Sequence, residues 1–355
     1  MKRATLSQSR LAELLKKFSS VRIAVVGDYF LDKYLDLEPS MEETSVETGR
    51  PAHQVVDIRT FPGCAGTVVS NLASLGVKTL HAIGFRGDDG EGYDLEKRLH
   101  ALGCHTEHLH AVGDRHTPTY LKPRDCNDAS LAGEHDRYDT KNRTSTSTAT
   151  EYLLLQSLAA VVGQVDALMI MDQVEEPNCG VVTDTVRQEI IRLAALHPRV
   201  VFWADSRRRI HDFRQVIIKP NQFEVMSREF PMPGEEIELQ ALLAAARGLR
   251  EKAGAPVVIT RGALGMLVSD PQWTEVPGFQ VTGETDPTGA GDSASAGMVT
   301  SLCAGADLAE AAVVANLVAS VTIEQLATTG VARPDQLPGR LELWLQQQSN
   351  KESRS

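Results

Sequence analysis

Residues 285–297 (TDPTGAGDSASAG) combine features that suit the binding of an anion. Gly289 and Gly291 lack side chains at positions where a backbone would approach a ligand closely. Pro287 favours an extended conformation just before them, and the small side chains that follow suit a buried helix. A helix start carries unpaired N–H groups and a partial positive charge. The spacing therefore predicts a cradle for a phosphoryl group, with Asp292 inside the first helical turn.

A simpler interpretation of Asp292 stays open. An acidic residue in the first turn of a helix complements the helix dipole, which stabilises a helix by about 0.3–1 kcal/mol. Two other nucleotide motifs are excluded. The turn is no Walker A loop, because G-x-x-x-x-G-K-[ST] is absent, and it is no dinucleotide fingerprint, because it lies far from the first strand.

The elements that must position this turn follow from the apolar pattern. Short apolar runs alternate with longer amphipathic segments, and several runs end in Asp, Gly or Pro, where a strand would enter a loop. This alternation predicts an α/β protein with a mostly parallel sheet covered on both faces. The predicted strands are 22–28, 79–84, 167–172, 200–205, 215–220, 256–260 and 265–269, and the predicted helices are 65–76, 91–102, 151–163, 181–196 and 236–253.

Two polar segments, residues 35–60 and 113–149, are too long for ordinary strand–helix connections. We expect them to form a lid or a small accessory sheet. The chain from 1 to 345 is expected to form a single domain, and the polar tail, residues 346–355, is expected to be disordered.

The bulk composition narrows the possible partners. The 355 residues are 42% apolar, and 47 acidic against 36 basic residues give a net charge of −11, which disfavours nucleic acid and anionic membranes. No apolar run is long enough to span a bilayer. Five cysteines without a C-x-x-C spacing indicate reduced thiols in a cytoplasm. The cluster His105, His108 and His110 is better explained by a strand or loop than by a metal site.

The motif DPTGAGDSASAG resembles the C-terminal signature of the PfkB, or ribokinase-like, carbohydrate kinases. The resemblance extends over roughly residues 20–335. It implies a three-layer αβα sandwich with a small β lid, and transfer of the γ-phosphoryl group of ATP to a sugar hydroxyl. Gly289, Ala290 and Gly291 would then stabilise charge on the transferred group, and Asp292 would act as general base. Such chemistry depends mainly on positioning and electrostatics.

Near the N-terminus, "VVGDYFLD" matches the family's sugar-binding segment. The resemblance implies that Asp32 accepts sugar hydroxyls and that Asp28 lies close to the sugar. Either residue could instead be an ordinary acid in the loop after a strand.

The segment "PGCAGTVVSNLASLG" resembles the N-terminal signature, usually a Gly-Gly pair followed by an Asn that touches the sugar. Gly63 is kept and Asn71 fits, and both are expected at the sugar. Cys64 stands where the second glycine is usual, and Thr67 replaces the sugar-binding Asn. A threonine can still bind a hydroxyl, but with a shorter reach.

Nucleotide contacts are implied by "KPNQFE" and "VVITRGALGMLV". Asn221 and Glu224 would lie near Mg²⁺, which binds through water and a few oxygen ligands, although the same spacing is a helix capping box. An ordinary turn would also explain the glycines of the second motif. In some relatives a monovalent cation, such as potassium, is held by positions that match Asp286, Thr288 and carbonyls near 319–327. The implied nucleotide-binding residues are Lys219, Asn221, Glu224, Thr260, Gly262, Gly265 and Asn316.

Within the family, the pattern most resembles the heptose-phosphate kinases of ADP-heptose synthesis, although segment 35–60 departs from that branch. Ribose, fructose or a hexose phosphate stay open as alternative substrates. A phosphorylated sugar would need cations, for which Arg207 and Arg208, directly after a predicted strand, are the preferred candidates over Lys122, Arg124 and Arg137.

Two other functions compete with the kinase. A sugar or nucleotide sensor on the same fold would have no need of Asp292 behind an intact anion-binding turn. A nucleotide-binding oxidoreductase is disfavoured, because the first strand–helix turn lacks the glycines that admit a pyrophosphate. Dimerisation through the lid is common among members of the family that the chain resembles, and the edge "HQVVDIRTF" would benefit from being covered, so a homodimer is a further expectation.

Overall fold

The computed structural model describes every residue except 129, 233, 327 and 353–355. Its centre is a six-stranded sheet in which all neighbouring strands are parallel, in the order β13-β12-β11-β2-β7-β8. The predicted α/β fold with a mostly parallel sheet is thereby confirmed. The strands are β2 (Arg22–Gly27), β7 (Thr79–Gly87), β8 (Cys104–Val112), β11 (Ala167–Asp172), β12 (Val201–Ser206) and β13 (Ile217–Ile218).

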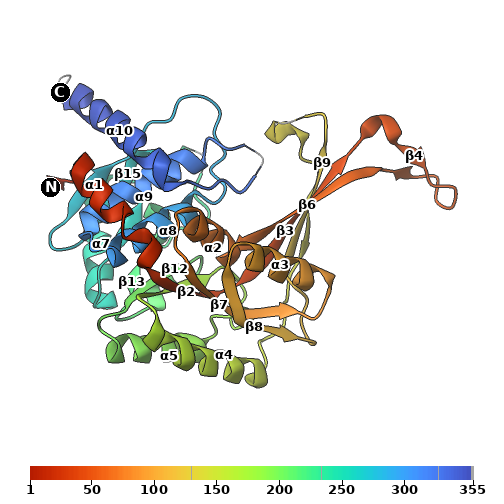
Figure 1. Cartoon of the computed structure of the whole chain (residues 1–355), viewed down its shortest axis with the longest axis horizontal. Helices are drawn as coiled ribbons and strands as arrows, with labels where there is room; N and C mark the ends of the chain where they lie inside the picture. Colours follow the sequence, from red (N-terminus) through yellow and green to blue (C-terminus); the bar gives the residue numbers. More distant parts are fainter. Residues whose placement is uncertain (129, 233, 327, 353–355) are drawn as a thin grey trace.

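Alternating side chains of this sheet feed two separate cores. Ile23 and Val25 of β2 belong to one core, whereas Ala24 and Val26 belong to the other. Helices seal both faces, which makes three layers (Figure 1). The first core is covered by α1 (Gln8–Leu15), α2 (Ala65–Ser74), α3 (Gly90–Ala101), α8 (Ala290–Cys303), α9 (Leu308–Thr322) and α10 (Leu337–Glu352), and the second by α4 (Thr148–Val161), α5 (Asp184–Leu196) and α7 (Leu239–Ala253).

A second sheet, in the order β1-β16-β15-β14, continues the main one. Two isolated parallel bridges, Ile218 with Val257 and Asn221 with Thr260, join its edge to the end of β13. The connection includes the short helix α6, which begins after Asn221. The elements are β1 (Lys2–Arg3), β14 (Val258–Thr260), β15 (Gly265–Val268), β16 (Thr274–Pro277) and α6 (Gln222–Val225).

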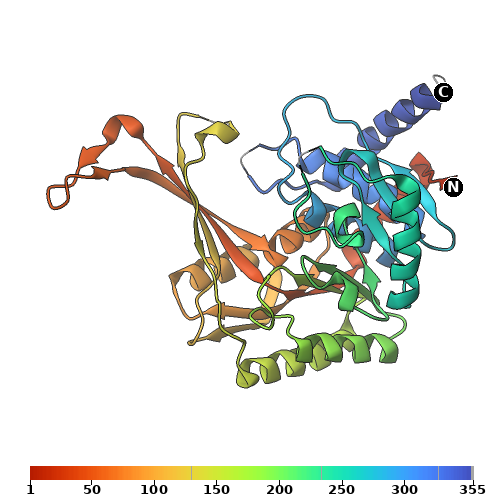
Figure 2. The ribbon, with the colours of Figure 1, turned by 180° about the vertical axis from the view of Figure 1, so that it is seen from behind.

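A four-stranded arm projects from the body, in the order β10-β9-β3-β6 (Figure 1; Figure 2 shows it from behind). Both segments predicted as a lid lie on it, but the arm begins earlier than expected, at Tyr29, because only Asp28 separates β2 from β3. The strands are β3 (Tyr29–Leu37), β6 (Val55–Cys64), β9 (Thr119–Asp125) and β10 (Tyr138–Thr140), with β4 (Glu43–Thr44) and β5 (Pro51–Ala52) near the tip.

Helix α8 carries the small side chains noted in the sequence, and residues 293–301 are all buried. A Cβ added to Gly297 would lie 2.9 Å from Cγ2 of Val318 on α9, so the two helices pack too closely for a larger residue. The close packing fixes the start of α8, and thereby the turn before it, against the core.

The C-terminal tail differs from its prediction. Residues 346–352 continue α10, so the expected disorder is wrong there, and 353–355 lie outside the described residues. Trp344 explains the difference, because it is 1% exposed and its Nε1 donates to the carbonyl of Pro277 at 2.8 Å. Gln347 also exchanges two hydrogen bonds with the backbone of Gln280. In the described part of the chain, no helix combines the length and the apolar character needed to cross a membrane.

Candidate active site

The anion-binding turn lies at the start of α8. Gly289 is the N-cap residue, with a φ of 74°, a left-handed conformation that glycine adopts without strain. A Cβ on Gly289 would come within 3.4 Å of Cγ2 of Thr67, so α2 packs against the turn. Ala290 is the first helical residue, and Gly291 is exposed. A Cβ on Gly291 would meet only Nζ of Lys219, at 3.6 Å, so packing within the chain does not require a glycine there.

Asp292 follows in the first turn of α8 and is half-buried. Within the described part of the chain, its carboxylate has no hydrogen-bond or ion-pair partner. Burial raises the pKa of Asp292 to about 7, with contributions from Asp205 and Asp32, while Lys219 and Arg207 oppose the shift. A carboxylate with such a pKa can accept a proton near neutral pH.

Lys219 and Asp205 form a buried ion pair beside the turn. Nζ lies 2.8 Å from Oδ2, and the side chains are 7% and 13% exposed. Burial lowers the pKa of Lys219, but Asp205, Glu224 and Asp292 more than offset this, so the pKa is raised and the amine stays charged. Sequence reasoning missed Asp205. The available signal was its place at the C-terminal end of a central strand, where open α/β sheets bind ligands.

Asn221 and Glu224 form a helix capping box, which was the alternative interpretation of their spacing in the sequence. Oδ1 of Asn221 accepts from the N–H groups of Phe223 (2.8 Å) and Glu224 (2.9 Å), and Oε2 of Glu224 accepts from the N–H of Asn221 (2.7 Å). Burial raises the pKa of Glu224 to about 7, and the charge of Asp205 adds to this. A contact of this pair with magnesium stays a prediction.

The predicted nucleotide contacts around the 260–265 turn lie close to Asn221. Thr260 forms a bridge with Asn221, and Gly262 is exposed with open space around its Cα. The fold itself requires a glycine at position 265, because φ is 90° there and a Cβ would lie 2.1 Å from the carbonyl oxygen of Val276.

Asn316 lies on α9 and is 8% exposed. Its Nδ2 donates to the carbonyls of Val276 (3.4 Å) and Pro277 (3.2 Å), so the amide is largely used within the protein. Asp286 is also buried. Its Oδ1 accepts from the N–H of Thr288 at 3.0 Å, and its own N–H donates to the carbonyl of Ile323 at 2.8 Å. The segments predicted to hold a monovalent cation are thus in contact, although residue 327 lies outside the described residues.

On the arm, Asp32 of β3 pairs with Lys122 of β9. Nζ lies 3.2 Å from Oδ1 of Asp32 and 3.2 Å from the hydroxyl of Tyr34, and both charged side chains are nearly buried. A Cβ on Gly63 would lie 2.9 Å from Oδ2 of Asp32, so this glycine leaves room for the carboxylate. Lys122 was a candidate phosphate ligand in the sequence, but in the structure its ammonium group is paired with Asp32.

Three residues predicted at the sugar are buried and hydrogen-bonded within the protein. Asn71 is fully buried, and its Nδ2 donates to the carbonyl of Thr67 at 3.0 Å, so the prediction is wrong for Asn71. Thr67 is 4% exposed, and its hydroxyl donates to the carbonyl of Pro62 at 3.4 Å. Asp28 is 3% exposed, and its two oxygens accept three hydrogen bonds from backbone N–H groups, but it also lines the pocket described below, so its place close to the sugar stays a prediction.

Cys64 is the N-cap residue of α2, with a φ of 54° and a ψ of −114°. This conformation suits the glycine that the family usually carries there. Burial raises the pKa of its thiol well above the ordinary value, and the negative charges of Asp292 and Asp32 raise it further. The sulfur therefore stays protonated.

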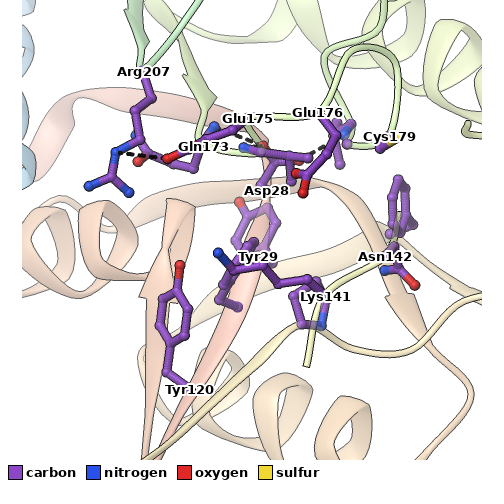
Figure 3. A pocket seen from close by; sticks show the side chains of 16 residues that line it. Asp28, Tyr29, Tyr120, Lys141, Asn142, Gln173, Glu175, Glu176, Cys179 and Arg207 are labelled. Carbon is purple, nitrogen blue, oxygen red and sulfur yellow. Dashed lines mark hydrogen bonds and ion pairs between the residues drawn. The ribbon is translucent and has the colours of Figure 1, made fainter. Parts of the chain in front are cut away.

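A pocket lies between the arm, the segment before α4 and the loop after β11 (Figure 3). Arg207 lines it, and its nearest acid, Glu175, is 3.9 Å away. Arg208 is not one of its lining residues, because its guanidinium pairs with Glu175 and Glu229 at 3.2 Å each. The other polar or aromatic lining residues are Asp28, Tyr29, Phe30, Phe85, Tyr120, Lys141, Asn142, Gln173, Glu175, Glu176 and Cys179.

Comparisons with known proteins agree on one family. The pfkB family carbohydrate kinase profile matches residues 23–335. The bifunctional protein HldE of Methylobacillus flagellatus is 29% identical over 320 residues, which cover 89% of this chain and 62% of that protein. The chain therefore spans less than two thirds of the length of this relative.

Solved structures share the fold at low sequence identity. Escherichia coli phosphofructokinase-2 in complex with fructose-6-phosphate superposes with a TM-score of 0.66 at 18% identity, covering 91% of this chain and 98% of that one. Arabidopsis thaliana ribokinase complexed with ribose and ATP gives a TM-score of 0.63 at 16% identity, covering 91% and 99%. The profile match over residues 23–335 establishes that the chain belongs to the pfkB family of carbohydrate kinases.

Proposed function

We propose that the protein transfers the γ-phosphoryl group of ATP to a sugar hydroxyl, with Asp292 as the general base. The observation that carries this proposal is the carboxylate of Asp292, which has no partner in the described chain and a pKa raised to about 7. A structural acid at a helix start would be expected to bond to the backbone. Glu310, at the corresponding third helical position of α9, does so, because its Oε2 accepts from the N–H of Asp307 at 3.1 Å.

The anion-binding turn and Lys219 supply positive potential next to this base. The exposed side of Gly291 and the amine of Lys219 face the same space, 3.6 Å from where a Cβ would be. A ligand that approaches the backbone of Gly291 explains why no side chain is present there. Backbone N–H groups and a buried ammonium would stabilise the negative charge that develops on a transferred phosphoryl group.

The residues present also fit a magnesium ion bound with ATP. Burial raises the pKa of Glu224 and of Asp292 to about 7, and the negative charge of Asp205 adds to both shifts. No group of three metal-ligating side chains converges among the described residues, which suits an ion held largely by water and phosphate oxygens. Asn221 and Glu224 would hold its water ligands, and the ion would neutralise phosphate charge. A potassium ion beside Asp286 and Thr288 is a further part of the proposal, testable by comparing rates in potassium and choline chloride.

For the acceptor we propose a sugar in the pocket of Figure 3, with heptose 7-phosphate as the first candidate. The sequence pattern and the bifunctional HldE relatives support this choice, at 28–30% identity. Asp32 would accept a hydroxyl near Asp292, and Arg207 would bind the substrate's own phosphate. Arg208 is a weaker candidate, because two glutamates already neutralise it.

A homodimer through the arm is also proposed. β6 is the edge strand of the arm, and Val55, Val56 and Ile58 on it are 42%, 52% and 53% exposed. Burying this apolar edge in a second copy would remove it from water. Ile58→Lys should then give a monomer by light scattering. The five unpaired thiols and the use of ATP favour the cytoplasm as the working compartment.

The function is tested by ADP release over free sugars, hexose phosphates and heptose phosphates. One sugar should turn over, and Asp292→Asn should lose at least about a hundredfold in kcat. Asp307→Asn is the matched control at the start of the next helix and should keep its activity. If no sugar is phosphorylated although ATP binds, the kinase proposal fails and a sensor becomes the better explanation.

A further inference from the structure

The loop of residues 173–181 joins β11 to α5 and forms one wall of the pocket. It contains no helix or strand, so its own backbone does not pair its polar groups in a regular pattern. Gln173, Glu175 and Glu176 line the pocket from this loop, opposite the arm (Figure 3). Something outside the loop must therefore fix its shape.

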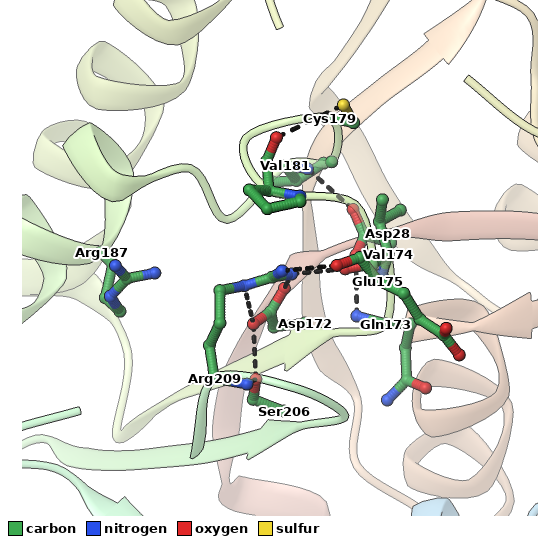
Figure 4. A network of polar contacts seen from close by, with 12 residues as sticks. Asp28, Asp172, Gln173, Val174, Glu175, Cys179, Val181, Arg187, Ser206 and Arg209 are labelled. Carbon is green, nitrogen blue, oxygen red and sulfur yellow. Dashed lines mark hydrogen bonds and ion pairs between the residues drawn. The ribbon is translucent and has the colours of Figure 1, made fainter. Parts of the chain in front are cut away.

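The N–H groups at both ends of the loop converge on Asp28 (Figure 4). Oδ2 of Asp28 accepts from Gln173 (2.8 Å) and Val174 (2.9 Å), and Oδ1 accepts from Val181 (2.7 Å). One buried carboxylate thus ties together residues at the start and at the end of the loop. Burial raises the pKa of Asp28 to about 6, and the negative charge of Asp172 contributes to this rise. The three backbone hydrogen bonds lower the pKa and offset part of it.

The carbonyl groups of the loop converge on Arg209 instead. Its Nη1 donates to the carbonyl of Glu175 at 3.1 Å, and its Nη2 donates to the carbonyl of Val174. The same guanidinium pairs with Asp172, with Nη2 at 2.5 Å from Oδ1 and Nε at 3.1 Å from Oδ2. Asp172 also accepts from the hydroxyl of Ser206 at 2.5 Å. The guanidinium is therefore held rigidly while it holds the loop.

Gly180 shows how closely Asp28 and the loop are fitted. A Cβ there would lie 2.5 Å from Oδ1 of Asp28 and 2.9 Å from Cβ of Val174. The carbonyl of Gly180 accepts from the hydroxyl of Thr146 at 2.7 Å, which adds a third attachment from the segment before α4. No other residue type fits at this position without a shift of Asp28 or of the loop.

We propose that Asp28 and Arg209 are positioning residues that clamp the 173–181 loop as a wall of the acceptor pocket, one through its N–H groups and the other through its carbonyls. Asp28 lines the pocket but has both oxygens engaged by the loop, and Arg209 is not one of the lining residues, so neither needs to touch the substrate. Loss of the clamp should weaken the binding of the acceptor and leave the phosphoryl-transfer step largely intact. The kinetic part of this inference rests on the proposed function, whereas the structural part does not.

The first experiment is hydrogen–deuterium exchange on the full-length protein without ligand. In Asp28→Asn one of the two acceptor oxygens becomes an NH2 donor, so either the amides of Gln173 and Val174 or the amide of Val181 lose their acceptor, and peptides over 173–181 should exchange at least about tenfold faster. Arg209→Lys should speed exchange in the same peptides, because a single ammonium cannot reproduce the fork of contacts. Unchanged exchange in both variants would overturn the proposal.

The matched control is Asp166→Asn. Asp166 precedes β11, and its Oδ2 accepts from the N–H of Arg22, the first residue of β2, at 2.9 Å. It therefore links β11 to β2 at the end of the sheet opposite to Asp28. Asp166→Asn should leave exchange over 173–181 unchanged. If it accelerates exchange there as much as Asp28→Asn does, the effect is general destabilisation and the clamp is wrong.

The second experiment is steady-state kinetics on the sugar that the ADP-release assay identifies. Asp28→Asn should raise KM for the sugar by about tenfold to a hundredfold, with KM for ATP and kcat within about threefold of the wild type. If Asp28→Asn does not fold, Gly180→Ala displaces the carboxylate without removing its charge and should raise the same KM. A fall in kcat at unchanged KM would contradict a positioning role. If the wild type phosphorylates no sugar, the proposed function fails, and the exchange data still decide the clamp.

Discussion

Two aspartates at the carboxyl end of the main sheet differ in their partners. Asp28 accepts three backbone hydrogen bonds, whereas Asp292 has no partner in the described chain. Burial raises both pKa values, to about 6 for Asp28 and about 7 for Asp292. The comparison teaches that a motif acid with all its oxygens engaged serves the fold, whereas one left without a partner is available to a ligand. The expectations below test this distinction, from the largest effect to the smallest.

The largest effect is expected from Lys219→Met, which leaves Asp205 buried without its partner. Breaking a buried ion pair costs about 3–5 kcal/mol of unfolding free energy, and loss of a cation at the turn should lower kcat by about a hundredfold or more. Urea unfolding and ADP release measure the two quantities. The double variant with Asp205→Asn should recover much of the stability but not the rate. Full recovery of the rate would show that Lys219 has only a structural role.

A tenfold effect is expected at the arginines after β12. Arg207→Ala should raise KM for a sugar phosphate by about tenfold and leave KM for the corresponding free sugar unchanged, because it removes a charged donor from the pocket. Arg208→Ala is the neighbouring control and should have a much smaller effect, since Glu175 and Glu229 already hold its guanidinium. Equal effects on KM for phosphorylated and free sugars would show that Arg207 does not bind the phosphate of the substrate.

The pH dependence of stability separates the acid at the turn from the exposed acids of the surface. The raised pKa of Asp292 means that the folded state keeps its proton to higher pH than the unfolded state. This stabilising contribution is complete below about pH 4 and is lost as the pH rises through about 7. Asp292→Asn should therefore gain stability relative to the wild type between these pH values. Parallel curves for the two proteins in chemical denaturation would show that the pKa is not raised.

The smallest effect is expected at Cys64. Its φ of 54° and ψ of −114° are strained for a side chain, so Cys64→Gly should increase the unfolding free energy by about 1 kcal/mol. Cys303, on α8, is a control with helical backbone, and Cys303→Gly should destabilise instead. A loss of stability in Cys64→Gly would mean that packing of the sulfur outweighs the strain.

Much of the fold could be predicted from the sequence, because apolar runs such as 167–172 mark buried parallel strands whatever their neighbours are. The turn before Asp292 was also predictable, since glycines and a helix start are adjacent in the chain. Asp205 was missed because its role depends on Lys219, fourteen residues away along the sequence. The tail was wrongly expected to be disordered, because the contact of Trp344 with Pro277 cannot be read from local composition. Asn71 was assigned to the sugar for a similar reason, since its partner is the backbone of Thr67 within its own helix.

The most direct test of the account compares kinetics of Asp292→Asn and Asp28→Asn on one sugar, with binding of sugar and nucleotide measured by calorimetry. We expect Asp292→Asn to bind both ligands like the wild type while its kcat falls by about a hundredfold or more. Asp28→Asn should instead keep its kcat and bind the sugar at least about tenfold more weakly. If Asp292→Asn turns over at the wild-type rate, or if both variants change the same parameter, the contrast between a free and an engaged carboxylate does not explain this site.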